Sequence, residues 1–222
     1  AISEDALFLQ LTKPLFVPVF LVFFFIRNKR ISIPLILFLL YSFLGDSSSM
    51  FFSNETFIKA SGVMYFLSYL SLVVFVAPKF DYSSLNKLVA SYFLIIVLIN
   101  LYFLYTIYGL LVTVIPDTLE VFLFGAKSIS LILLLFISFG VYLNAETNLS
   151  IFFLLMAICF AFSDVLSYVN QYYVYHWAFS MIDRVMHVAG LFFLFNYVVV
   201  YNSLIKKAAI YNNEITTGKI LA

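Results

Sequence analysis

Apolar residues fill seven long stretches of the chain, and short polar segments separate them. A helix needs about 20 apolar residues to cross the roughly 30 Å hydrocarbon core of a bilayer, and each stretch meets this length. The ten-residue alternation of polar and apolar positions that marks transmembrane barrels does not occur in the sequence. We therefore expect an all-α bundle in one domain, residues 1–222, with transmembrane helices near 5–26, 33–53, 57–77, 86–108, 117–143, 148–172 and 177–204.

The residues at the edges of these stretches are typical of helix starts. Serine, asparagine and aspartate accept hydrogen bonds from the first backbone N–H groups of a helix, and proline is tolerated in its first turn. Acidic residues also complement the positive end of the helix dipole. The candidate starting residues are Pro34, Ser83 or Ser84, Asn148, and Asp117 with Glu120.

The composition supports a membrane protein. The chain is 64% hydrophobic and 10% charged, and its mean hydropathy is +1.09. A water-soluble domain of this length could not bury so much apolar surface. The formal net charge of +1 gives no strong field to attract nucleic acid, so we expect no nucleic-acid partner. The single cysteine, Cys159, has no second cysteine to pair with and is expected to pack between helices.

The distribution of charge along the loops predicts the orientation. With seven helices, eight basic residues fall on one side of the membrane, namely Arg27, Lys29, Arg30, Lys79, Lys87, Lys206, Lys207 and Lys219. The positive-inside rule then places the C-terminus in the cytoplasm and Ala1 outside, in what we expect to be a bacterial inner membrane. An even number of helices would require one more helix before Ala1.

Two carboxylates lie deep within apolar stretches, at Gly45-Asp46 and Ser163-Asp164. A charged side chain at the bilayer centre costs roughly 2.5 to 3.5 kcal/mol on insertion scales, so such residues usually face a polar cavity and mark a function. Lys13, near the prolines at 14 and 18, and Lys127 lie in the same half of the membrane and are candidate partners. A salt bridge that only holds helices together is the simpler alternative.

Other polar residues extend this constellation. Ser42 lies one turn from Asp46, Tyr168 lies one turn from Asp164, and His187 lies one turn from Asp183. Asp183 and Arg184 form either part of the site or a structural pair of neighbouring charges. Lys59 is expected to extend towards the membrane interface. The histidines are not spaced as metal ligands, so we expect no metal. A ligand that enters from the bilayer would need no soluble cofactor, and we expect none.

Five segments of the chain resemble the YhhN-like lysoplasmalogenase family of integral membrane hydrolases. They are Lys13-Pro14-Leu15, Ser42-Phe43-Leu44-Gly45-Asp46, Gly62 with Phe66-Leu67-Ser68, Phe162-Ser163-Asp164 and Ala189-Gly190. The resemblance implies that the protein cleaves the vinyl ether bond of lysoplasmalogen. The products would be a fatty aldehyde and glycerophosphocholine or glycerophosphoethanolamine. Tyr69 stands where many members of the family have histidine.

The residues fit this chemistry. Hydrolysis of a vinyl ether needs a proton for the alkene carbon and a base that activates water. Two carboxylates in different surroundings can divide these tasks, because burial favours the protonated form and a nearby lysine favours the ionised form. We expect Asp46 and Asp164 to be this catalytic pair. The residues expected to bind the lysophospholipid substrate are Lys13, Ser42, Tyr69, Lys127, Ser163, Tyr168, Asp183, Arg184 and His187.

The main alternative function is a transporter for a small solute or for protons, because intramembrane charges and a proline-containing helix are also typical of transporters. The sequence shows no inverted repeat, which disfavours this alternative. A light-sensing protein would require a Schiff-base lysine in the last helix, and 177–204 contains none. A purely structural subunit would gain little from so many costly polar groups. The sequence predicts membrane lipids as partners and leaves the oligomeric state open.

Overall fold

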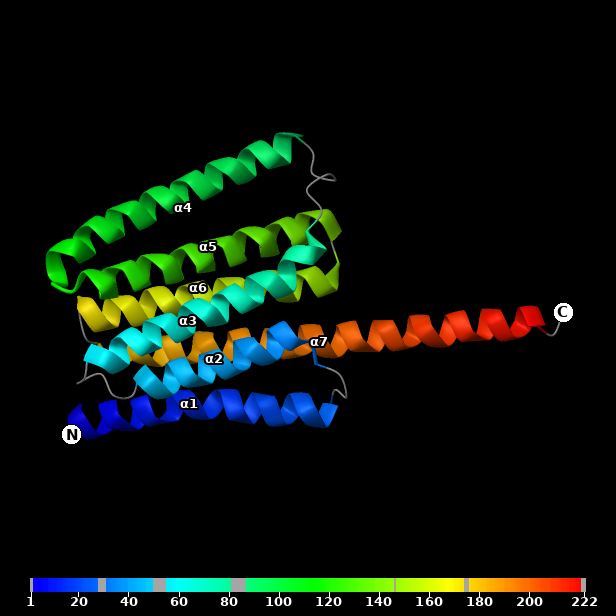
Figure 1. Cartoon of the computed structure of the whole chain (residues 1–222), viewed down its shortest axis with the longest axis horizontal. Coiled ribbons are helices and arrows are strands. Elements are labelled where there is room, and N and C mark those ends of the chain that lie inside the picture. Colours follow the sequence, from blue (N-terminus) through cyan, green and yellow to red (C-terminus); the bar gives the residue numbers. More distant parts are fainter. Residues whose placement is uncertain are drawn as a thin grey trace.

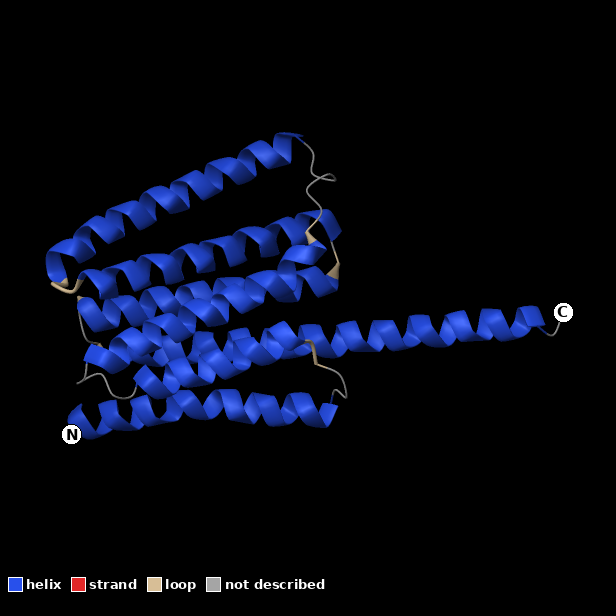
Figure 2. Cartoon of the chain, viewed as in Figure 1, coloured by secondary structure: helices blue, strands red, loops and turns tan. Residues whose placement is uncertain are grey.

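The computed structural model describes residues 2–27, 31–49, 55–80, 87–145, 147–173 and 176–220. Within these residues there are seven α-helices, one short 3-10 helix and no strand (Figure 2). The predicted all-α architecture is confirmed. The elements are α1 (Ile2–Arg27), α2 (Ile33–Ser49), α3 (Glu55–Val76), η1 (Ala77–Lys79), α4 (Lys87–Val114), α5 (Thr118–Ala145), α6 (Asn148–Tyr172) and α7 (Trp177–Ile220).

The helices lie roughly side by side, and consecutive helices run in opposite directions, so the two termini lie at opposite ends of the bundle (Figure 1). α2 packs against α3, α3 against α5, and α6 against α7, while α1 and α4 lie at the two outer edges. The cavity described below is built where α2 and α6 end and where α3 and α5 begin. This up-and-down order therefore brings together residues from distant parts of the chain.

In the part of the chain that the structure describes, five helices are long and apolar enough to cross a membrane, and α2, with 17 residues, is apolar but shorter. Large apolar side chains also point outward, as on α4, where Tyr105 is 75% exposed and Leu94 is 59% exposed. Outward-facing apolar residues of this kind are suited to contact with lipid. These features support an integral membrane protein.

Two helices continue more than five residues beyond their predicted ends. α7 extends to Ile220, well past the predicted end at 204, and projects beyond the rest of the bundle (Figure 1). The apolar stretch does end there, but the following residues contain no proline and the helical backbone continues. α4 was expected to end at 108 and instead passes through Gly109 to Val114. Pro116 is what ends it, because proline disfavours a helical conformation in the residue before it.

The predicted helix starts are mostly confirmed. The carboxylate of Asp117 accepts hydrogen bonds from the backbone N–H groups of Leu119 (2.9 Å) and Glu120 (3.3 Å), which caps α5. α6 does begin at Asn148, but its cap is Thr147, whose hydroxyl accepts from the backbone N–H of Ser150. Ser83 and Ser84, and residues 50–53 at the predicted end of the second helix, lie outside the described residues.

A packed aromatic core closes the bundle beneath the cavity. Phe160 of α6 is fully buried, and its ring lies 5.6 Å from the ring of His187 and 6.4 Å from that of Tyr69. Gly190 allows this packing, since a Cβ atom at that position would lie 2.6 Å from the Phe160 ring. The core therefore holds the faces of α3 and α7 that carry Tyr69 and His187.

Candidate functional site

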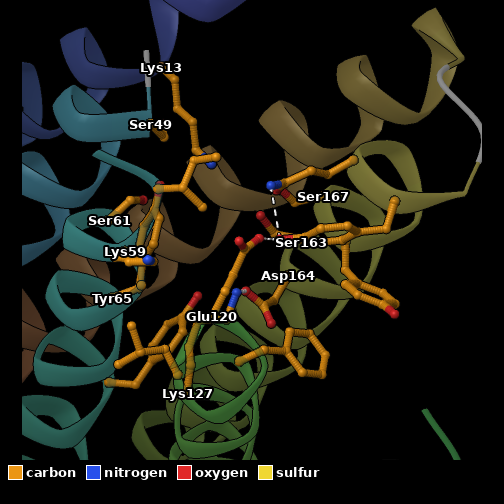
Figure 3. A pocket seen from close by; sticks show the side chains of 18 of the residues that line it. Lys13, Ser49, Lys59, Ser61, Tyr65, Glu120, Lys127, Ser163, Asp164 and Ser167 are labelled. Carbon is orange, nitrogen blue, oxygen red and sulfur yellow. Dashed lines mark hydrogen bonds and ion pairs between the residues drawn. The ribbon is translucent and has the colours of Figure 1, made fainter. Parts of the chain in front are cut away.

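A polar cavity lies at the end of the bundle where α3 and α5 begin, and it encloses about 780 Å³ of non-protein space, including open solvent at its mouth (Figure 3). Its wall comes from α1, α2, α3, α5, α6 and α7. Most of the predicted site residues line it. These are Lys13, Tyr69, Lys127, Ser163, Asp164, Tyr168 and His187.

Asp164 forms an ion pair with Lys127 in the cavity wall. The Lys127 Nζ lies 2.7 Å from Asp164 Oδ1, and the two side chains are 16% and 12% exposed (Figure 3). The lysine comes from α5 and the carboxylate from α6, so the pair joins two antiparallel helices. The expected lysine partner is thus present, and it compensates a charge that would be costly to bury alone.

Asp46 is fully buried and is held by residues from three other helices. The Tyr65 hydroxyl donates a 2.6 Å hydrogen bond to Asp46 Oδ1, and Lys13 Nζ lies 3.7 Å from the same oxygen. On the other side, His187 Nε2 lies 3.9 Å from Asp46 Oδ2. We call Asp46, Tyr65 and His187 the Asp46 cluster. Asp46 is not itself part of the cavity wall, but Lys13, Tyr65 and His187 are.

Gly45 allows α2 and α3 to pack closely at this point. A Cβ atom at Gly45 would lie 3.2 Å from the Tyr65 ring, and the Ser61 hydroxyl donates a 3.1 Å hydrogen bond to the Gly45 carbonyl. The absence of a side chain at Gly45 thus allows α3 to approach α2 closely. Because a side chain at Gly45 would crowd the Tyr65 ring, this glycine helps to place the hydroxyl on Asp46.

Tyr65 connects the two ion pairs. Its ring centroid lies 5.3 Å from Lys13 Nζ and 5.8 Å from Lys127 Nζ, within the range of cation–π attraction. One tyrosine therefore contacts Asp46 through its hydroxyl and both lysines through its ring. Analysis of the sequence did not single out Tyr65. The available signal was the polar helical face of Ser61, Tyr65, Ser68 and Tyr69, which repeats at intervals of three and four residues.

Several buried polar atoms around the cavity have no hydrogen-bond partner among the described residues. They include Asp46 Oδ2, His187 Nε2 and the Tyr168 hydroxyl. Buried polar atoms in proteins are nearly always hydrogen-bonded, so unpaired ones require an explanation. Two of the three belong to the Asp46 cluster and the third lies in the cavity wall. The cavity therefore offers both charged groups and unused hydrogen-bonding capacity.

Ser42, Asp183 and Arg184 are not part of the cavity wall. Ser42 is buried one turn from Asp46. Asp183 accepts a 2.5 Å hydrogen bond from the Ser163 hydroxyl and pairs with Arg184 at 2.9 Å. Asp183 therefore contacts both Arg184 and Ser163, while the buried Arg184 Nε has no hydrogen-bond partner among the described residues. Asp183 contacts the cavity wall through the hydroxyl of Ser163, which does line it.

A second set of polar contacts surrounds the mouth of the cavity. Lys59 pairs with Asp117 instead of extending freely towards the interface, because α5 begins beside the first turn of α3. The Lys59 ammonium holds the pKa of Asp117 below its usual range. The Tyr172 hydroxyl donates to the Glu120 carboxylate. Among the described residues, histidine, cysteine and carboxylate side chains form no group of three that could hold a metal ion.

No family model, curated protein or solved structure matches this chain.

Replacing Tyr65 with phenylalanine tests the link between the two ion pairs. The Y65F variant retains the ring but removes the donor to a buried carboxylate, and a hydrogen bond to a charged group contributes about 1.5 to 3 kcal/mol. We expect the free energy of unfolding in mixed detergent micelles to fall by this amount. Y105F on α4, where the tyrosine is 75% exposed, is the matched control and should leave stability unchanged. Equal stability of Y65F and wild type would contradict the proposed contact.

Proposed function

We propose that the protein is a membrane-embedded hydrolase that cleaves the vinyl ether bond of lysoplasmalogen. The single observation that carries the proposal is the arrangement of two carboxylates around one polar cavity, each beside a lysine and linked through Tyr65. Acid/base hydrolysis needs two groups with different tasks, and these two carboxylates have different surroundings. Asp164 lines the cavity, whereas Asp46 is fully buried behind the residues that line it.

The location of each carboxylate supports a division of roles between the two. A base that activates water must reach that water directly, and Asp164 is the carboxylate in the wall. A proton donor can instead lie behind the wall if hydrogen-bonding groups connect it to the cavity. Asp46 is in this position, and Tyr65 and His187, which contact it, line the cavity. Asp164 is therefore the proposed base, and the Asp46 cluster is the proposed source of the proton.

The reaction begins with proton transfer from the Asp46 cluster to the alkene carbon distal to the ether oxygen, which leaves an oxocarbenium ion. Water then attacks the carbon bonded to oxygen, and Asp164 takes the proton of that water to give a hemiacetal. In the collapse step Asp164 returns this proton to the leaving glycerol oxygen, while the hemiacetal hydroxyl gives its proton to the Asp46 cluster. The carbon–oxygen bond breaks, an aldehyde and an alcohol leave, and both groups regain their starting protonation states.

The lysines suit the head group of this substrate. A lysophospholipid carries a phosphate diester, and an ammonium group binds phosphate as a point charge. Lys13 and Lys127 present two ammonium groups to the same cavity. Each already faces a carboxylate, so in the complex the phosphate would share these cations with Asp46 and Asp164. Tyr69 and Tyr168 are the wall residues proposed to hydrogen-bond the glycerol backbone.

The test is the release of aldehyde by the purified protein. The protein in detergent micelles is incubated with lysoplasmenylcholine or lysoplasmenylethanolamine, and aldehyde is measured over time. We expect catalytic release from at least one of these lipids and none from the saturated ether analogue, which lacks the alkene. No aldehyde from either lipid, together with solute or proton flux in liposomes, would overturn the proposal in favour of a transporter.

A further inference from the structure

An apolar groove runs between α4 on one side and α5 and α6 on the other. Two adjoining hollows form it, and they share Asn100, Ile132 and Leu135. On α5 the lining residues recur from Phe124 to Phe139, which corresponds to about 22 Å along the helix. We call this feature the α4 groove. Within the described residues, α5 is the one helix against which α4 packs extensively. The face of α4 towards α6 is therefore available to line a groove.

The α4 groove meets the polar cavity at one place. Phe124, Asp164 and Tyr168 belong to the walls of both. The cavity side of this junction carries Lys127, paired with Asp164, and the groove side is almost entirely apolar. Asp164 therefore lies where the charged polar cavity meets the apolar α4 groove.

We infer that the α4 groove holds the single hydrocarbon chain of the substrate while the polar cavity holds its head group. The inference rests on the proposed function and defines the substrate class more narrowly. A vinyl ether is the first bond of the chain, so a lipid bound across the junction places this bond beside Asp164. One leaflet is about half of the roughly 30 Å hydrocarbon core, so a groove of about 22 Å accommodates a chain of full leaflet length.

The geometry also explains how a lipid enters. The groove lies beside a lipid-facing helix, as exposed side chains of α4 outside the groove, such as Tyr102 (68%) and Leu98 (56%), indicate. A chain already in the bilayer can move sideways into the groove without crossing water. The head group then needs to pass only the junction to reach Lys127.

Blocking the groove with a large side chain provides the test. S128W on α5 and A161W on α6 place an indole in the groove beside the junction, at half-buried positions that are not part of the polar cavity wall. We expect kcat/KM for the long-chain lysoplasmalogen to fall by between about ten- and a hundredfold, because displacement of the chain displaces the reacting bond. Cleavage of an analogue with the same head group and a very short chain should remain near wild type, which also reports that the variants fold.

A126W is the matched control. Ala126 is also on α5 and half-buried, but it lines a separate hollow between α3, α4 and α5 that does not include Asp164. We expect this variant to cleave both substrates at nearly the wild-type rate. Unchanged cleavage of the long-chain substrate by both S128W and A161W would overturn the inference.

Photolabelling separates this inference from the proposed function. A lysophospholipid with a diazirine at the end of its chain should label residues near Phe139 and Leu154, at the far end of the groove, in wild type but not in S128W. Such labelling without any release of aldehyde would support the groove and overturn the hydrolase. Labelling spread evenly over the lipid-facing surface, or unchanged in S128W, would overturn the groove.

Discussion

The D164N variant should lose most of its aldehyde-releasing activity. Asparagine has nearly the shape of aspartate but cannot take a proton from water, and the loss of a general base typically lowers the rate by a factor of about 10² to 10⁴. The effect should appear in kcat, because Asp164 acts on water in the reacting complex rather than on lipid binding alone. Initial rates with lysoplasmenylcholine or lysoplasmenylethanolamine, measured over a range of lipid fractions in the micelle, separate kcat from KM.

The matched control for this variant is D117N. It makes the same chemical change at a carboxylate that also pairs with a lysine, but at the mouth of the bundle instead of in the cavity wall. Asparagine caps a helix about as well as aspartate, so α5 should be unaffected. We expect D117N to retain activity near wild type. A D164N protein that releases aldehyde at the wild-type rate would exclude Asp164 as the base.

The fold was largely predictable because the length of an apolar stretch is set by the membrane. Seven stretches became seven helices within the described residues, and their starts lay within a few positions of those expected. The ends were less predictable. Membrane thickness limits the apolar stretch but not the helical backbone, so α7 continues well past its last apolar turn. In the same way Gly109 lies within α4 instead of ending it.

The candidate site was predictable where charge decides the arrangement. A buried carboxylate requires a compensating group, and lysines in the same half of the membrane were the available ones. Lys127 beside Asp164 and Lys13 beside Asp46 follow from this requirement. Tyr65 is different, since it is one of 16 tyrosines and carries no charge. Its contact with Asp46 depends on how closely α3 approaches α2 at Gly45, which no property of the sequence near Tyr65 specifies.

The K127M variant should be strongly destabilised. Methionine keeps much of the length of the lysine side chain but leaves Asp164 as an uncompensated carboxylate that is only 12% exposed. Removal of one partner of a buried ion pair costs about 3 to 5 kcal/mol. We expect a loss of this size in the free energy of unfolding, measured by titration of the micelles with a denaturing detergent. Stability equal to that of wild type would contradict a buried, interacting pair.

The double variant K127M/D164N distinguishes a structural ion pair from a functional one. Removing both charges leaves no buried carboxylate to compensate. Replacing a buried ion pair with uncharged residues often changes the free energy of unfolding little. We therefore expect the double variant to recover most of the stability that K127M loses, with a coupling energy that the mutant cycle measures. Aldehyde release should nevertheless remain as low as in D164N. Recovery of stability without recovery of activity would mean that the bundle folds without these charges, and that the chain retains them because the reaction uses them.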